Sequence, residues 1–218
     1  AIETSIDENI TNDIQTAGIV MDPNTGAVLG LVGGVDYSKS QYNRALSNNR
    51  SVGSTIKPFL YYAALENNFT ASTTFTSERT TFVFSENQTY SPTNYGDQYP
   101  NKEISLASAI ATSDNIYAVK THLFLGSDVL VDMMKRVGIT TKLDSIPSLA
   151  LGSQPISLIE MTAAYSMLAN EGYKVKPHFI KRVEDIHGNV LYEYKDNKEA
   201  VLNKSITFIL NELLSNTS

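Results

Sequence analysis

Pro58 limits where one helix of this chain can begin. Proline lacks a backbone N–H, so a helix tolerates it only in the first turn, where that N–H would have no helical acceptor. The residues that follow are apolar at 59, 60, 63, 64 and 65, the spacing of one helical face. We therefore expect a helix from about Ser54 to Asn67. Ser54 lies at or just before its N-terminus, and Gly53 allows a sharp turn into it.

The rest of the sequence alternates hairpins with helical segments. Apolar β-prone runs flank turn-forming residues at 22–26 and again at 187–189, which predicts hairpins within 17–34 and 178–194. Residues 72–95 are rich in Thr, Ser, Phe and Tyr and favour short strands, whereas 91–103 has the Pro, Asn and Gly content of a loop. Helices are expected at 104–112, 115–125, 128–137, 156–172 and from 203 onward. This pattern predicts one α/β (α+β) domain.

Composition argues against several functions. The net charge is −6 with no basic stripe, which disfavours nucleic acid as a partner. The chain has no cysteine, so it can form neither a disulfide nor a thiolate metal site. The histidines are scattered and form no metal-binding motif; they are His122, His178 and His187. We expect no metal and no cofactor. No apolar run approaches the ~18 residues that span a bilayer.

Ser54-Thr55-Ile56-Lys57 is the one S-x-x-K string in the chain. Residues three apart share a helical face, so the Ser54 hydroxyl and the Lys57 amine can approach each other. Burial of Lys57 would lower its pKa and let the neutral amine accept the serine proton. The positive end of the helix dipole favours an alkoxide and an oxyanion at Ser54. Taken alone, the string also fits a serine N-cap followed by a solvated lysine.

Ser113-Asp114-Asn115 interrupts two apolar helical segments. The triplet either caps the helix that follows or forms a buried polar site. In a site, Ser113 could pass a proton between Lys57 and a leaving group, and Asn115 could hold Lys57 and a substrate amide. Asp114 would face away from the site or cap the helix. The same S-x-N pattern occurs at Ser47-Asn48-Asn49 and Ser85-Glu86-Asn87, where a turn is the simpler interpretation.

S-x-x-K followed by S-D-N resembles the serine-acylation motifs of penicillin-binding proteins and class A β-lactamases. The surrounding strings narrow the resemblance to the transpeptidase domain of high-molecular-weight penicillin-binding proteins of the bifunctional class A type. These strings are the first hairpin, GSTIKPFLYYAALE, YSPTNYGDQY, ISLASAIATSDNIYAVK and LALGSQPISLIEMTAAYSMLANEGY. The family implies a serine β-lactamase / D,D-peptidase-like fold, in which an antiparallel sheet accompanies a helical subdomain.

The resemblance also implies a role for each motif residue. Ser54 attacks the penultimate D-Ala carbonyl of a peptidoglycan stem peptide, and Lys57 is its base. Ser113 relays a proton to the leaving amine, and Asn115 contacts Lys57 and the substrate backbone. An amine of a neighbouring stem then resolves the acyl-enzyme, and β-lactam antibiotics acylate Ser54 as mimics. The family works at the extracytoplasmic face of the bacterial cell membrane. The anchor is not in these 218 residues, and the resemblance suggests that a glycosyltransferase domain precedes Ala1.

One family motif is absent. No K-T-G or K-S-G string occurs, and the nearest, Asn24-Thr25-Gly26, lacks the cation and lies in a predicted turn. In the family that strand binds the substrate carboxylate and provides one oxyanion N–H. We therefore expect residues 1–218 to be the N-terminal portion of one transpeptidase domain, inactive without the C-terminal strands of the same domain. The alternatives are a β-lactam sensor or β-lactamase of the same fold, or a non-catalytic interaction module.

Two further features are interpreted structurally. Lys120 lies beyond Asn115 and is expected to be solvated or structural. A group of aromatic residues could line a cleft but is expected to pack within a strand-rich lobe: Phe75, Phe82, Phe84, Tyr90, Tyr95 and Tyr99.

Overall fold

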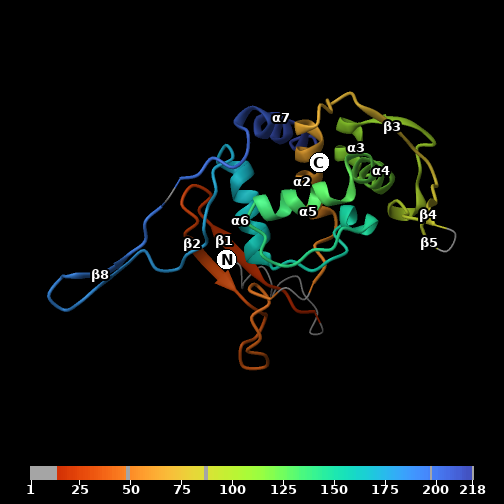
Figure 1. The fold of residues 1–218 in the computed structure, drawn as a ribbon. Coiled ribbons are helices and arrows are strands. Elements are labelled where there is room, and N and C mark those ends of the chain that lie inside the picture. Colours follow the sequence, from red (N-terminus) through yellow and green to blue (C-terminus); the bar gives the residue numbers. More distant parts are fainter. Residues whose placement is uncertain (1–13, 48–49, 86–87, 197, 218) are drawn as a thin grey trace. The chain divides into compact units, whose positions relative to one another are not determined.

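The computed structural model describes residues 14–47, 50–85, 88–196 and 198–217. The chain divides into two compact units. Unit 1 comprises residues 1–50, 137–141 and 155–203, and unit 2 comprises residues 51–136, 142–154 and 204–218. Ser54, Lys57, Ser113 and Asn115 all belong to unit 2. Each unit is described by itself below (Figure 1).

Unit 1 is built on the first predicted hairpin. Strands β1 (Gly18–Met21) and β2 (Val28–Val32) pair antiparallel, with Gly18 opposite Val32, and helix α6 (Leu158–Ala169) packs on β1. Residue 178 extends the edge of β2, because the Val28 N–H donates to the His178 carbonyl at 2.9 Å. Gly26 must lack a side chain here, since a Cβ would lie 2.5 Å from the Lys176 carbonyl oxygen.

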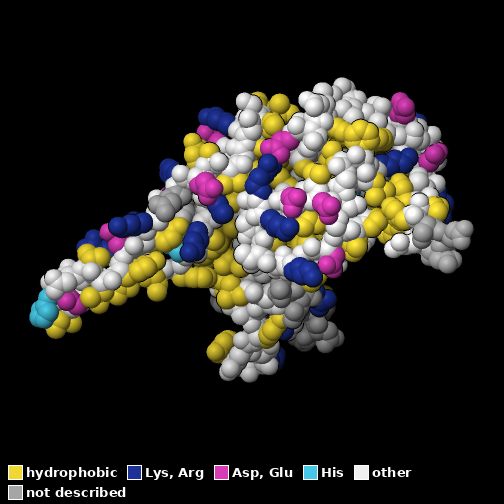
Figure 2. All heavy atoms as spheres, viewed as in Figure 1, with side chains coloured by type: hydrophobic (Ala, Val, Ile, Leu, Met, Phe, Trp, Pro, Cys, Tyr) yellow, Lys and Arg dark blue, Asp and Glu magenta, His cyan; other side chains and the backbone are white. Residues whose placement is uncertain are grey.

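The second predicted hairpin is also present in unit 1. Strands β7 (Arg182–Glu184) and β8 (Val190–Glu193) pair antiparallel, and every residue of both strands is exposed. Figure 2 shows hydrophobic side chains along this hairpin, at the left of the view. They include Leu191 and, at the tip, Ile186. The hairpin is therefore stabilised by its own backbone pairing and surface contacts rather than by a core.

Unit 2 is a cluster of helices around α2 (Lys57–Glu66). The 3₁₀ helix η1 (Gly53–Ile56) leads into α2, which packs against α4 (Asn115–Leu125), α5 (Ser127–Arg136) and α7 (Lys204–Leu214). Helix α3 (Leu106–Thr112) and the 3₁₀ helix η3 (Pro147–Leu151) complete the cluster. Eight of the ten residues of α2, from Lys57 to Ala64, are buried, so this helix is the core of the unit.

Short strands cover one side of unit 2. Strand β3 (Thr74–Ser77) pairs with β6 (Lys102–Ser105), and β4 (Phe82–Ser85) pairs with β5 (Gln88–Tyr90), both antiparallel. A single 3₁₀ turn, η2 (Tyr95–Asp97), lies in the loop between β5 and β6. The predicted aromatic group is divided here: Phe75 packs edge-on against Tyr117, whereas Tyr95 is 98% exposed.

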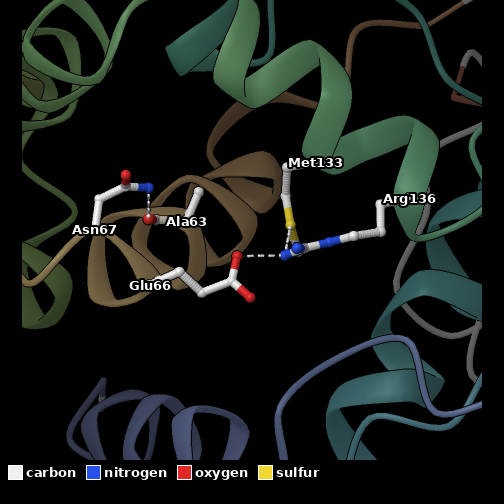
Figure 3. A network of polar contacts seen from close by, with 5 residues as sticks. All are labelled: Ala63, Glu66, Asn67, Met133 and Arg136. Carbon is white, nitrogen blue, oxygen red and sulfur yellow. Dashed lines mark hydrogen bonds and ion pairs between the residues drawn. The ribbon is translucent and has the colours of Figure 1, made fainter.

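An ion pair joins the far end of α2 to α5 (Figure 3). Glu66 Oε2 accepts a hydrogen bond from Arg136 at 2.5 Å, and the Arg136 guanidinium lies 5.5 Å from the centre of the Tyr62 ring. Arg136 also contacts the Met133 sulfur at 3.0 Å, and the Asn67 amide closes the helix by donating to the Ala63 carbonyl. These contacts fix the C-terminal end of α2, whereas the candidate site lies at its N-terminal end.

Three expectations are corrected by the structure. The helix predicted at 104–112 begins at Leu106, because Ile104 is in strand β6 and the Ser105 side chain caps α3. The helix predicted at 156–172 ends at Ala169, where Glu171 and Gly172 adopt positive φ. In the described residues, the predicted antiparallel sheet is found only as two-stranded sheets. None of the described helices combines the length and apolar character needed to cross a membrane.

Candidate active site

Ser54 lies in the one-turn 3₁₀ helix that leads into α2. The Lys57 N–H donates to the Ser54 carbonyl, and Pro58 lies in the first turn of α2, as its missing N–H requires. Ser54 is exposed, and within the described part of the chain its hydroxyl has no hydrogen-bond partner. The Ser54 hydroxyl therefore faces solvent at the N-terminal end of a buried helix, as the position of Pro58 predicts.

A close approach between two glycines holds the Ser54 turn. Gly53 N–H donates to the Gly152 carbonyl at 3.0 Å, and Gly152 ends η3 with φ +65°. A Cβ on Gly152 would lie 2.0 Å from the Gly53 carbonyl oxygen, so only glycine fits. Gly53 also has positive φ, +59°, but a Cβ there would meet open space. Sequence analysis identified Gly53 and missed Gly152, since nothing in the local sequence links residues so far apart.

Lys57 joins the two motifs. It is 3% exposed, and its ammonium donates to the Ser113 carbonyl at 2.6 Å, the Ser113 hydroxyl at 3.0 Å and Asn115 Oδ1 at 2.6 Å. Ser113 can offer both oxygens to Lys57 because it adopts left-handed φ, +52°, in the turn between α3 and α4. The structure therefore brings Lys57, Ser113 and Asn115 together and places Ser54 one turn before Lys57.

Burial dominates the electrostatics of Lys57. Removal from water lowers the pKa of its ammonium to about 8, and the nearby negative charge of Asp114 opposes this shift. At neutral pH about a tenth of the molecules then carry a neutral amine at Lys57, compared with fewer than about one in a thousand for an unperturbed lysine. A lysine with this pKa can act as a general base near neutrality.

Asp114 caps α4, as expected, and also anchors the loop before β6. Its Oδ1 accepts from the Tyr117 N–H, while its Oδ2 accepts from the Ser77 hydroxyl and the Asn94 amide. Asn94 in turn accepts from the Asn115 N–H at 2.8 Å. Asn94 was not singled out by sequence analysis as a site residue, although it lies in the string YSPTNYGDQY. Its buried amide fixes the backbone of Asn115 from 21 residues away.

Within the described residues, one side-chain N–H of Asn115 has no hydrogen-bond partner. Its Oδ1 accepts from Lys57, and its amide nitrogen donates to the Thr93 carbonyl at 2.7 Å. An amide nitrogen carries two protons, so a second N–H of Asn115 can reach an external carbonyl. The side chain is oriented by two fixed contacts and can still bind a third group.

The remaining candidates lie outside this site. Lys120 donates to the Thr76 carbonyl at 2.8 Å and is structural, as expected. The described residues contain no group of three or more His, Asp or Glu arranged to hold a metal ion. The two other S-x-N strings cannot be compared, because Asn48, Asn49, Glu86 and Asn87 lie outside the described residues.

The chain was compared with known protein families, curated relatives and solved structures. The family described as "Penicillin binding protein transpeptidase domain" matches residues 16–215. Penicillin-binding protein 2D of Bacillus subtilis is 49% identical over 208 residues, which are 95% of this chain and 30% of that protein. Penicillin-binding protein 1A of Pseudomonas aeruginosa is 36% identical over 82% of this chain and 22% of its own length. The chain thus spans less than a third of these relatives.

Solved structures share the fold. Penicillin-binding protein 1A from Haemophilus influenzae superposes with a TM-score of 0.84 at 25% identity, over 93% of this chain and 35% of that one. PonA1 of Mycobacterium tuberculosis, solved in complex with penicillin V, gives a TM-score of 0.83 at 21% identity, over 97% of this chain and 58% of that one. The mixed α/β architecture described above is therefore that of penicillin-binding transpeptidases.

Proposed function

Because the chain belongs to the transpeptidase family of penicillin-binding proteins, we propose that it carries the acylation centre of a peptidoglycan D,D-transpeptidase. Ser54 is the nucleophile, Lys57 its base, Ser113 the proton relay and Asn115 the group that orients Lys57 and the substrate amide. The observation that carries this proposal is the buried Lys57, bonded at 2.6–3.0 Å to both residues of the second motif.

The contacts of Lys57 support a specific sequence of proton transfers in the proposed acylation. The ammonium of Lys57 uses all three N–H groups on Ser113 and Asn115, so it can accept the Ser54 proton only after losing one of its own. The neutral amine then takes that proton as Ser54 Oγ attacks the carbonyl of the penultimate D-Ala. Ser113 Oγ, 3.0 Å from the Lys57 nitrogen, delivers a proton to the departing D-Ala amine and recovers one from Lys57.

We propose that residues 1–218 supply the nucleophile but only part of the oxyanion site. The chain has no K-T-G or K-S-G string, and loss of one oxyanion donor costs about 10²–10³ in rate. The C-terminal strands of the same domain would complete the site. Stem peptides and β-lactams are the proposed ligands, at the extracytoplasmic face of a bacterial membrane.

Labelling with a fluorescent penicillin tests the proposal. The chain is labelled alone and together with a segment that carries the K-T-G strand of a relative, with Ser54→Ala as the control. We expect a long-lived ester on Ser54 that depends on the added segment. Strong labelling of the chain alone would refute the requirement for the segment, and a rapidly hydrolysed ester would indicate a β-lactamase. Absence of label in both forms would refute the acylation centre.

A further inference from the structure

A pocket adjoins the candidate site in unit 2. It is a cavity of about 340 Å³ with two walls. One wall is the turn between α3 and α4, at Thr112 and Ser113; the other is the loop around η2, at Tyr95, Gln98 and Tyr99. The proton relay assigned to Ser113 therefore lies on the lining of a cavity large enough for one or two amino-acid residues.

The loop wall of this pocket is held in place without any ligand. Asn94, at its start, is buried and bonded to Asp114 and to the Asn115 N–H. Further along, Asp97 accepts from the Tyr99 hydroxyl at 2.9 Å and pairs with Arg79. The Arg79 guanidinium also lies 5.4 Å from the centre of the Tyr99 ring. The pocket is thus preformed, which lowers the entropic cost of binding.

The Tyr95 side chain takes no part in the contacts just described, which hold the loop in place. Its ring is 98% exposed although both of its neighbours in sequence are fixed or tightly turned: Asn94 is buried, and Gly96 adopts φ +63°. A fully exposed aromatic ring on the rim of a fixed pocket is available to cover a ligand. The lining around it consists of Tyr99, Pro100 and neutral polar side chains, and its one carboxylate, Asp114, is buried and hydrogen-bonded. This chemistry suits an uncharged stretch of peptide.

The reaction itself indicates which peptide. If Ser113 protonates the departing amine during acylation, microscopic reversibility requires the incoming amine to give up its proton at the same place. The chain that carries the attacking amine must then approach past Ser113. The pocket that Ser113 lines is therefore next to the place where the attacking amine must give up its proton.

We propose that this pocket, lined by Tyr95, Gln98 and Ser113, binds the acceptor stem peptide; the inference rests on the proposed transpeptidase function. The acceptor nitrogen attacks the ester carbonyl of the acyl-enzyme, and a C–N bond forms as the bond to Ser54 Oγ breaks. The amine proton passes to Ser113 Oγ, whose own proton moves to Lys57 and from there to Ser54 Oγ. Tyr95 covers the acceptor chain and Gln98 offers its amide to the peptide backbone.

The test separates acceptor binding from acylation. The protein is used in the form that labelling shows to be acylated, with the added K-T-G segment where it is needed. The acyl donor is an N-acylated D-alanyl thioester, whose thiolate leaving group needs no proton from Ser113. The acceptors are a stem tetrapeptide with a free side-chain amine and, for comparison, free D-alanine. The measured quantity is the ratio of aminolysis to hydrolysis as each acceptor concentration is raised.

We expect Tyr95→Ala to raise the tetrapeptide concentration for half-maximal aminolysis about tenfold, corresponding to about 1.4 kcal/mol. The effect on free D-alanine should be less than about twofold, because an acceptor without a peptide chain gains little from Tyr95. Tyr95→Phe, which keeps the ring, should restore tetrapeptide use. Tyr37→Ala removes a tyrosine that is 75% exposed in unit 1 and serves as the matched control.

The outcomes are distinguishable. Equal tetrapeptide dependence in Tyr95→Ala and the parent protein, with acyl-enzyme formed in both, overturns the acceptor pocket and leaves the proposed function standing. An equal loss for tetrapeptide and D-alanine also overturns it, because the loop would then act only on Ser113. If the parent protein forms no acyl-enzyme from thioester or penicillin, the proposed function fails and this inference fails with it.

Discussion

The Lys57 ammonium has three N–H donors, and Ser113 and Asn115 supply an acceptor for each of them. Its protonation state therefore decides whether Lys57 can accept a proton. The protonated form is fully engaged with Ser113 and Asn115 and has no capacity to accept the Ser54 proton. The neutral form has a lone pair and can keep two of the three contacts. Burial, opposed by Asp114, holds the pKa of Lys57 at about 8 and keeps a usable neutral fraction near pH 7.

The first prediction concerns the pH dependence of acylation. If Lys57 is the base, as proposed, it must be neutral to act, and the second-order rate constant for labelling Ser54 with penicillin should rise with pH. It should reach half its maximum near the pKa of Lys57, about 8. The measurement is the labelling rate between pH 6 and 10, in the form of the protein that is acylated. A rate that does not change between pH 6 and 9 would exclude Lys57 as the base.

Asp114→Asn provides a charge control for that profile. The amide keeps an oxygen to cap α4 but removes the negative charge that raises the pKa of Lys57. The midpoint of the labelling profile should therefore move to lower pH. A shift to higher pH would show that Asp114 acts on the rate through another group.

At the scale of elements, η1 is positioned by η3 through the contact between Gly53 and Gly152. Both helices are short, and a 3₁₀ turn has weak hydrogen-bond geometry, so this pairing has a large share in defining the Ser54 turn. Misplacement of a nucleophile by about 1 Å can cost about 10² in rate. The position of Ser54 thus depends on Gly152, which lies outside both sequence motifs.

The second prediction is the effect of Gly152→Ala. The new Cβ would fall 2.0 Å from the Gly53 carbonyl oxygen, so backbone must move in η1 or η3. We expect acylation of Ser54 to slow at least about 100-fold and the free energy of unfolding to fall by more than about 2 kcal/mol. Gly188→Ala is the matched control, since Gly188 also has positive φ but faces open space. It should cost only about 1 kcal/mol and leave the labelling rate unchanged.

The third prediction concerns α6 in unit 1. Burial raises the pKa of Glu160, but hydrogen bonds from Thr140, Ser157 and Thr141 outweigh it and lower the pKa to about 2. A carboxyl with a depressed folded pKa stabilises the fold above its unfolded pKa, about 4.5, and loses this contribution as pH falls toward 2. The free energy of unfolding should therefore decrease between about pH 5 and 2.

Urea titrations at several pH values measure this dependence. Glu160→Gln should be less stable than the parent at pH 7 and should show a smaller decrease between pH 5 and 2. Glu78→Gln, at an exposed position, serves as the control and should follow the parent. An unchanged decrease in Glu160→Gln would mean that other carboxyl groups cause the acid sensitivity.

At the scale of the whole chain, local signals were predicted well and distant contacts were not. The start of α2 follows from Pro58, and both hairpins follow from their turn residues, because these constraints act within a few positions. Lys57 meets Ser113 across 56 residues, and no periodicity or propensity encodes that contact. The residue types of the two motifs made a shared site one possibility, and the family resemblance favoured it. Asn94 and Gly152 were missed for the same reason: each is hydrogen-bonded to the backbone of residues that are distant in the sequence.

The contact between α7 and α2 is a further case of this long-range organisation, and it carries the last prediction. Helix α7 begins at Lys204, about 140 residues after the end of α2, yet it packs on α2 and α3. Leu210 is fully buried, whereas Phe208, on the same helix, is 64% exposed. The stability of α2 should therefore depend on the face of α7 that carries Leu210 and not on the face that carries Phe208.

Leu210→Ala should lower the free energy of unfolding by about 2–5 kcal/mol, because it opens a cavity in the helical cluster. Phe208→Ala removes a larger side chain from an exposed position and should change stability by less than about 0.5 kcal/mol. Urea unfolding followed by circular dichroism measures both. Labelling of Ser54 near the urea midpoint of the parent should fall in Leu210→Ala and persist in Phe208→Ala, since the acylation centre is only as stable as α2. Equal stability of the two variants would mean that α7 does not support α2 in solution.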